Sequence, residues 1–194
     1  MSELFIPVIY GSVRTARQGI KAARFVVREF ENRGIRTELV DPKERKLPLL
    51  DCMYKEFPPG QAPAVLEDLA AIFRSADGFA IVSGEYNHGI PPALKNMLDH
   101  FLEEYFWRPA AIVCYSGGQF GGVRAAMQLR MTLAEMGMVT IPSLFPIPHV
   151  QNAFDDEGTA TQAYTKESFG PFLDEFLWYA NALREARRGG VPES

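Results

Sequence analysis

The chain has 194 residues, 47% of them hydrophobic and 23% charged, a composition typical of one globular domain spanning residues 1–194. Its 20 basic and 24 acidic residues give a net charge of −4. That balance argues against binding to nucleic acid or to a membrane surface, because both partners require a clustered basic excess.

Cysteine usage and the first residues bear on the cellular compartment. Cys52 and Cys114 lie far apart and match no metal-binding or CxxC spacing, so we expect neither a disulfide framework nor a metal site. The apolar run that begins at Leu4 follows no basic region and is too short for a signal peptide or a membrane span. We therefore expect a cytoplasmic protein.

Short apolar runs alternate with helical patterns along the whole chain. Strands are predicted at residues 4–10, 35–41, 77–83 and 109–115, with a last strand opening at 138–141. Helices are predicted at residues 19–33, 64–75, 91–104, 122–136 and 165–188, and residues 42–61 are predicted to be irregular. This alternation indicates an α/β fold, in which parallel strands are joined by right-handed crossovers and helices cover both faces of the sheet. Ligands then bind in the loops after the carboxyl ends of the strands.

The loop after the first strand, within YGSVRTARQG (residues 10–19), has the composition of an anion site. Hydroxyl and backbone donors gather there beside a helix N-terminus, which favours negative charge: Ser12, Thr15, Gly11 and Gly19. Arg14 and Arg17 add guanidinium donors suited to phosphate. The spacing matches neither GxGxxG nor GxxxxGK[ST], so a phosphate monoester fits better than a pyrophosphate. The alternative is a solvated turn with two surface arginines.

Two further loops are rich in glycine. The loop after the third strand contains SGEYNHGIPPALKN (residues 83–96), whose glycines and proline pair suit a connection that presents backbone donors and an aromatic edge. The loop after the fourth strand, YSGGQFGG (residues 115–122), allows the backbone to approach a planar ligand closely. A flexible linker is the alternative interpretation of this third loop.

These three segments, in this order on an alternating chain, resemble the NADPH-dependent FMN reductases of the flavodoxin-like superfamily. The resemblance covers about residues 4–150, and the EYN…PPALKN block is its most specific part. It implies a three-layer flavodoxin-like sandwich with a five-stranded parallel sheet of order 2-1-3-4-5. Ala16 departs from the pattern, since many relatives carry glycine there, and it could alter the geometry of the phosphate turn.

The resemblance also implies the residues that contact the cofactor. The FMN phosphate would be held by Ser12, Arg14, Arg17 and Gln18. The isoalloxazine would be bordered on one side by Glu85, Tyr86, Asn87 and His88, and on the other by Ser116, Gly117, Gly118 and Gln119. Backbone N–H groups of Asn87, Gly117 and Gly118 could donate to the ring edges.

The implied activity is a two-step, ping-pong transfer of hydride from NADPH (or NADH) to bound FMN and then to a flavin, quinone, azo dye or metal oxyanion. No catalytic side chain is required, with His88 and Tyr86 as possible assistants, while Glu85 is interpreted as structural rather than as a general base. Arg17 and Arg108 are candidates for the 2′-phosphate of NADPH. The role of His149 is not readable from the sequence.

Two alternative functions stay open at this point. A flavodoxin-like electron carrier is disfavoured by the arginines in the phosphate loop and by the mild net charge. A phosphatase or sugar-phosphate enzyme is disfavoured because no CxxxxxR motif is present and Cys114 falls within a predicted strand.

Aromatic residues raise the question of subunit contacts. The runs Tyr105–Trp107 and Phe169–Tyr179 carry more apolar surface than one small domain obviously needs. Core packing and subunit contact are the two interpretations, and the resemblance favours a homodimer or homotetramer. His100 is expected to face another helix or a partner subunit.

Overall fold

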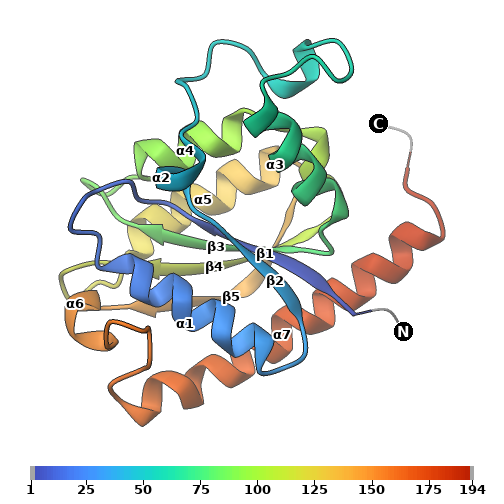
Figure 1. Ribbon diagram of the computed structural model, residues 1–194. Helices are drawn as coiled ribbons and strands as arrows, with labels where there is room; N and C mark the ends of the chain where they lie inside the picture. The colour runs from blue at the N-terminus through green and yellow to red at the C-terminus, as the bar shows by residue number, and fades with distance from the viewer. Residues whose placement is uncertain (1–2, 193–194) are drawn as a thin grey trace.

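The sheet has the topology that the resemblance predicts. The computed structural model describes residues 3–192, and its five strands pair in the order β2-β1-β3-β4-β5, all in parallel (Figure 1). The strands are β1 (Phe5–Tyr10), β2 (Arg36–Val40), β3 (Phe79–Gly84), β4 (Pro109–Tyr115) and β5 (Val139–Ile147). The α/β, flavodoxin-like fold class is therefore confirmed.

Helices cover the two faces of this sheet (Figure 1). One face carries α1 (Gly19–Glu31) and α7 (Ala163–Arg188), and the other carries α3 (Ala64–Ser75), α4 (Pro92–Asp99) and α5 (Val123–Glu135). Residues 3–192 also contain four short elements: α2 (Pro42–Arg45), the 3₁₀ turns η1 (Tyr54–Glu56) and η2 (Glu103–Tyr105), and α6 (Val150–Ala153).

The central strands are buried on both faces because they supply two separate hydrophobic cores. In β1, Val8 and Tyr10 pack into the core beneath α1 and α7, whereas Ile9 packs into the core beneath α3, α4 and α5. This two-sided burial explains why β1, β3 and β4 are continuous apolar runs instead of alternating patterns.

The aromatic residues of the terminal helix belong to the core. Phe169 and Phe176 of α7 are almost fully buried and pack into the core beneath α1, while Tyr105 is fully buried on the other side of the sheet. For these three residues core packing is the correct interpretation, whereas Trp107 of the other run is 38% exposed. Tyr164 and Trp178 are exceptions on α7, with 73% and 67% of their surfaces exposed.

Three predicted segments differ from the structure by more than one or two residues at their ends. The helix predicted over residues 91–104 ends at Asp99, and the 3₁₀ turn η2 follows where buried Glu104 binds Arg74 at 2.8 Å. The strand predicted at 138–141 extends to Ile147, because proline is tolerated on the edge strand of a sheet. The segment 42–61 contains α2, which Asp41 caps by accepting a hydrogen bond from the N–H of Lys43 at 2.9 Å.

All five strands point the same way, so the loops after β1, β3 and β4 meet at one end of the sheet. Among residues 3–192, no helix is both long enough and apolar enough to cross a membrane.

Candidate functional site

A cavity of about 190 Å³ lies where these three loops converge. Many of the residues that the resemblance implies line it: Ser12, Arg14, Arg17, Gln18, Glu85, Tyr86, Ser116 and Gly117. Asn87, His88, Gly118 and Gln119 are not among its lining residues, although their loops border it. The structure thus brings the first loop together with parts of the other two.

The two arginines of the first loop have different surroundings. Arg17 forms an ion pair with buried Asp41 at 2.5 Å and also donates to the carbonyl of Ser12 at 3.1 Å. Burial alone would lower the pKa of the Arg17 guanidinium, but Asp41 outweighs this effect and raises the pKa above its ordinary value. Arg17 therefore fixes the loop to the carboxyl end of β2.

Arg14 is exposed, and its guanidinium lies 6.0 Å from the centre of the Tyr86 ring. Unlike Arg17, it forms no ion pair with any carboxylate of the described chain. The adjoining N-terminus of α1 has no side-chain cap and no acidic residue in its first turn. Uncapped N–H groups beside a guanidinium without an ion pair are donors of the kind that an anion site requires.

Tyrosine hydroxyls lie beneath this loop. Ser12 Oγ and the Tyr86 hydroxyl are 2.7 Å apart, and the Tyr115 hydroxyl donates to that of Tyr10 at 3.3 Å. Burial raises the pKa of Tyr115 well above its ordinary value, so this phenol stays protonated. A Cβ on Gly19 would come within 2.0 Å of the Tyr115 ring, which explains why helix α1 begins with glycine.

The second loop is tied to the start of α5. Glu85 forms an ion pair with Arg124 at 2.5 Å and accepts hydrogen bonds from the backbone N–H groups of Arg124 and Ala125 at 3.0 and 3.3 Å. Burial alone would raise the pKa of Glu85, but these bonds lower it below the ordinary value. An ionised carboxylate held in this way is a helix cap, in agreement with the structural interpretation of Glu85.

The third loop is held by the segment that follows β5. The Gly117 carbonyl accepts from Gln151 at 3.3 Å and lies 3.2 Å from Nδ1 of His149, whose backbone N–H bonds to the Gly118 carbonyl at 3.1 Å. His149 therefore helps to hold the glycine loop in place, a role that its sequence context does not reveal. A Cβ on Gly118 would meet no atom within 4 Å, and its φ is not positive. Packing within the protein therefore does not require glycine at position 118. Close approach of a planar ligand would require it, because a side chain would stand in the way.

Several site residues escape sequence reasoning. Tyr115 and Asp41 lie at or just after the carboxyl ends of β4 and β2, so the rule that locates the three loops could also have found them. Val150 and Gln151 line the cavity from the far end of β5, a strand predicted to be shorter.

The structure places Arg108 far from the candidate site and His100 in the interior of the protomer. Arg108 lies just before β4, at the opposite end of the sheet, and donates to the carbonyls of Arg74, Ala76 and Phe106. Burial and the charge of Arg187 lower its pKa to about 10. Its assignment to the 2′-phosphate of NADPH is therefore wrong. His100 is buried within the protomer, where Nε2 lies 3.2 Å from the Pro48 carbonyl.

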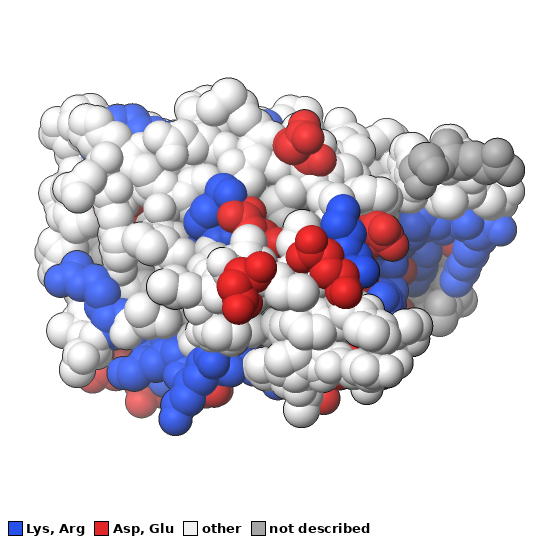
Figure 2. Space-filling model, turned by 90° about the horizontal axis from the view of Figure 1, so that it is seen from above, with Lys and Arg blue, Asp and Glu red and all other residues white. Residues whose placement is uncertain are grey.

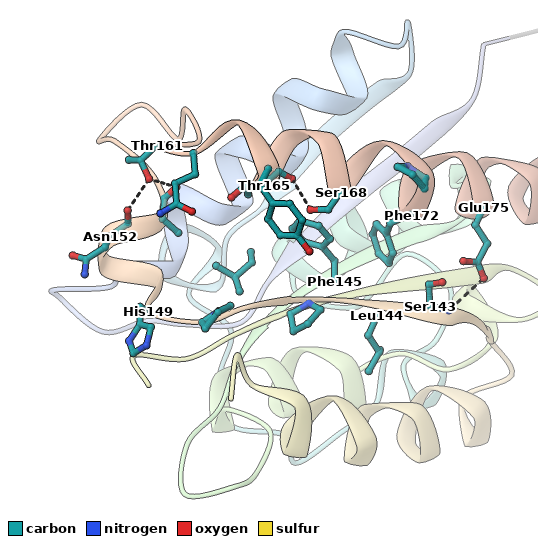
Figure 3. A pocket seen from close by; sticks show the side chains of 17 residues that line it. Ser143, Leu144, Phe145, His149, Asn152, Thr161, Thr165, Ser168, Phe172 and Glu175 are labelled. Carbon is teal, nitrogen blue, oxygen red and sulfur yellow. Dashed lines mark hydrogen bonds between the residues drawn. The ribbon is translucent and has the colours of Figure 1, made fainter. Parts of the chain in front are cut away.

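A larger cavity, of about 630 Å³, lies elsewhere, between β5 and α7 (Figure 3). Phe145 and Phe172 line it, and its one carboxylate, Glu175, accepts from the N–H of Ser143 at 3.3 Å. Its described lining contains no lysine or arginine, so it lacks the donors that a phosphate needs. The smaller cavity at the three loops is therefore the better candidate.

Comparison with known proteins decides among the functions left open. The family model for NADPH-dependent FMN reductases matches residues 5–152. The chain belongs to this family. It is 31% identical over 149 residues to an NAD(P)H-dependent FMN reductase of Saccharomyces cerevisiae, an alignment that covers 70% of this chain and 76% of that protein. It is 33% identical over 124 residues to a quinone reductase of Escherichia coli K12, covering 57% of this chain and 66% of that protein.

A solved structure also matches this FMN reductase. The flavoenzyme NAD(P)H:(acceptor) oxidoreductase of Paracoccus denitrificans superimposes with a TM-score of 0.74 over 92% of this chain and 98% of that one, at 21% identity. That structure shows the same fold. The family model and the Saccharomyces cerevisiae relative show that the protein is an oxidoreductase that uses FMN and NAD(P)H. The uncapped α1 N-terminus, the free Arg14 and the open glycine at 118 fit the phosphate and the ring of FMN.

Proposed function

We propose that this FMN reductase uses one site in turn for NADPH and for a flavin, quinone or related acceptor, with ping-pong kinetics. The observation that carries the proposal is the convergence of the α1 N-terminus and Arg14 with two glycine-containing loops at one end of the sheet. Bound FMN supplies the redox chemistry, since it can take a hydride from NADPH and pass two electrons to the acceptor.

In this proposal the chain's own residues bind and orient the cofactor. Arg14, Ser12, Gln18 and the first N–H groups of α1 hold the phosphate, and Arg17 keeps their loop in place through Asp41. Glu85, Tyr86, Asn87 and His88 border the ring on one side, with Ser116, Gly117, Gly118 and Gln119 on the other. Preorganised backbone N–H groups stabilise the negative charge that reduction places on the ring.

Arg14 and Arg17 should contribute differently to FMN affinity. We expect Arg14→Met to raise the Kd for FMN about tenfold, the loss of one charge-assisted hydrogen bond, with little change in the free energy of unfolding of the FMN-free protein. Arg17→Met leaves Asp41 buried without its partner, so it should lower that free energy as well. Fluorescence titration with FMN and urea unfolding measure the two effects. Equal effects of both substitutions on affinity and stability would contradict the assignment.

The function is tested by mixing the FMN-loaded protein with NADPH in the absence of oxygen. We expect the visible flavin absorbance to bleach within seconds and to return when a quinone is added. With both substrates varied, double-reciprocal plots should be parallel, and intersecting lines would rule out a shared site. Bound flavin that neither NADPH nor NADH bleaches would instead favour the electron carrier.

We also propose that the protein is a cytoplasmic homodimer or homotetramer. Figure 2 views the face that carries α3, α4 and α5, where charged side chains form small groups and leave broad uncharged areas. Met127 and Met131 lie one turn apart on α5 and are 47% and 70% exposed, and Phe120 is 54% exposed. An uncharged surface of this kind suits contact with a second copy. Light scattering that reports only a 21.7 kDa species would refute the oligomer.

A further inference from the structure

The loop after β3 is closed by a strained two-residue turn. The backbone N–H and C=O groups of Tyr86 and Gly89 bond to each other at 3.0 and 2.9 Å, and the two residues between them, Asn87 and His88, have φ values of +50° and +66°. Asparagine tolerates this left-handed conformation, but at the second position glycine is preferred. A histidine kept in a strained conformation at the edge of a site points to a function for its side chain.

The imidazole of His88 has a specific partner on α5. Arg124 Nη1 lies 2.7 Å from His88 Nε2, and Nη2 of the same guanidinium forms the ion pair with Glu85. Gln128 donates to the backbone carbonyl of His88 at 3.1 Å, so two residues of α5 hold the turn. Glu85 is in turn anchored by the first N–H groups of α5. The chain of contacts runs from the helix N-terminus through Glu85 and Arg124 to His88.

This contact constrains the hydrogen-bonding role of the His88 ring. A guanidinium can only donate hydrogen bonds, so Nε2 must accept and carry no proton. The proton of the neutral ring then resides on Nδ1, because the contact made by one ring nitrogen sets the tautomer of the other. An imidazolium, with protons on both nitrogens, could not accept from Arg124. His88 is exposed, and its ring has no other hydrogen bond within residues 3–192.

We propose that Arg124 is a positioning residue that holds His88 neutral and protonated on Nδ1, and that this N–H donates a hydrogen bond to the carbonyl oxygen of a quinone-type acceptor. The inference rests on the proposed function and names the acceptor class that the site recognises. The carbonyl oxygen gains negative charge as the acceptor is reduced, so a fixed donor stabilises the transition state more than the ground state. The quinone gains two electrons and one proton as hydride from reduced FMN, and the second proton of the hydroquinone comes from water, so His88 transfers none.

The tautomer can be measured without flavin or substrate. In ¹⁵N-labelled, FMN-free protein, long-range ¹⁵N–¹H correlation spectra separate the two tautomers, and His88→Gln assigns the signal among the three histidines. We expect Nδ1–H in the wild type and a shift toward Nε2–H in Arg124→Met. Arg124→Lys keeps a donor and should retain much of the Nδ1–H form. A wild-type ring protonated on Nε2, or an Arg124→Met spectrum like that of the wild type, would overturn the proposal.

Arg130 offers a matched control on the same helix. It binds the carbonyls of Ile141 and Pro142, away from His88, so Arg130→Met should leave the His88 spectrum unchanged. A change in that spectrum equal to the one in Arg124→Met would mean that any loss of an α5 arginine disturbs the turn, and would also overturn the proposal.

Kinetics test the hydrogen bond to the acceptor. The ratio of kcat/KM for a quinone to that for ferricyanide, which presents no carbonyl oxygen, should fall about fivefold in Arg124→Met, as expected for one lost hydrogen bond. His88→Gly relieves the strained φ and should raise Tm while lowering the ratio to the same extent. An unchanged ratio in both variants would refute the role of His88. If NADPH bleaches no flavin, the proposed function fails. The tautomer measurement, made without flavin, still tests whether Arg124 sets the tautomer of His88.

Discussion

Replacing Gly19 by alanine is expected to lower the free energy of unfolding by about 3 kcal/mol, the upper part of the range for overpacked sites. The new Cβ would lie 2.0 Å from the Tyr115 ring and 2.3 Å from its hydroxyl. Tyr115 cannot swing away freely, because it is buried and also lies about 3.0 Å from the position of a Cβ on Gly84. For a chain of this size the loss corresponds to a fall in Tm of roughly 6–12 °C, measurable by calorimetry.

A double-mutant cycle separates this clash from any effect of alanine on the helix. Tyr115→Leu removes the colliding atoms, so Gly19→Ala should cost at least about 1 kcal/mol less in that background than in the wild type. Gly118→Ala is the matched control, since no atom lies within 4 Å of its Cβ, and it should change stability by less than about 0.5 kcal/mol. A Gly19→Ala protein as stable as the control would show that Tyr115 does not occupy this position.

The sheet and the place of the site could be predicted because they depend on local patterns. The runs that became β1, β3 and β4 are apolar throughout and end at a glycine or a short polar loop, as strands buried on both faces must. Once the strands are parallel, their carboxyl ends share one edge, so the three loops converge without any knowledge of their contacts.

The partners of the charged residues could not be predicted, because they come from distant parts of the chain. Arg17 and Asp41 are separated by 24 positions, and His88 and Arg124 by 36. Sequence alone treats Arg14 and Arg17 as equivalent phosphate donors. Only the fold shows that a buried carboxylate at the end of β2 engages Arg17 and leaves Arg14 free.

The far end of β5 was missed for a different reason. Residues 138–141 are predicted only to open the last strand, because the prolines at 142 and 146 interrupt the strand pattern after Ile141. Yet β5 lies at the edge of the sheet, where missing N–H donors cost little. The segment after β5 therefore begins only at residue 148, which places His149 and, on α6, Gln151 where they hold the glycine loop in place.

Replacing Glu85 by alanine is expected to cost about 2–3 kcal/mol of stability. The substitution leaves Arg124 without its counter-charge and removes the acceptor for two N–H groups of α5. The loss of stability stays below that expected for a fully buried ion pair, because 40% of the Arg124 side chain is exposed and water screens its charge. It exceeds that of a surface pair, because Glu85 is only 4% exposed. Glu85→Gln keeps an oxygen acceptor and should cost about 1 kcal/mol. Urea unfolding near neutral pH measures both.

The pH dependence of the same variants identifies the ionised carboxylate as the stabilising form. Since the pKa of Glu85 is lower in the folded than in the unfolded protein, its contribution is complete above the ordinary glutamate pKa. It is lost as the pH falls through the folded value, where the carboxyl becomes protonated and the ion pair with Arg124 disappears. The stability difference between wild type and Glu85→Gln should therefore shrink on acidification within this window. A difference that stays constant across it would mean that hydrogen bonding, and not the charge of Glu85, holds the second loop to α5.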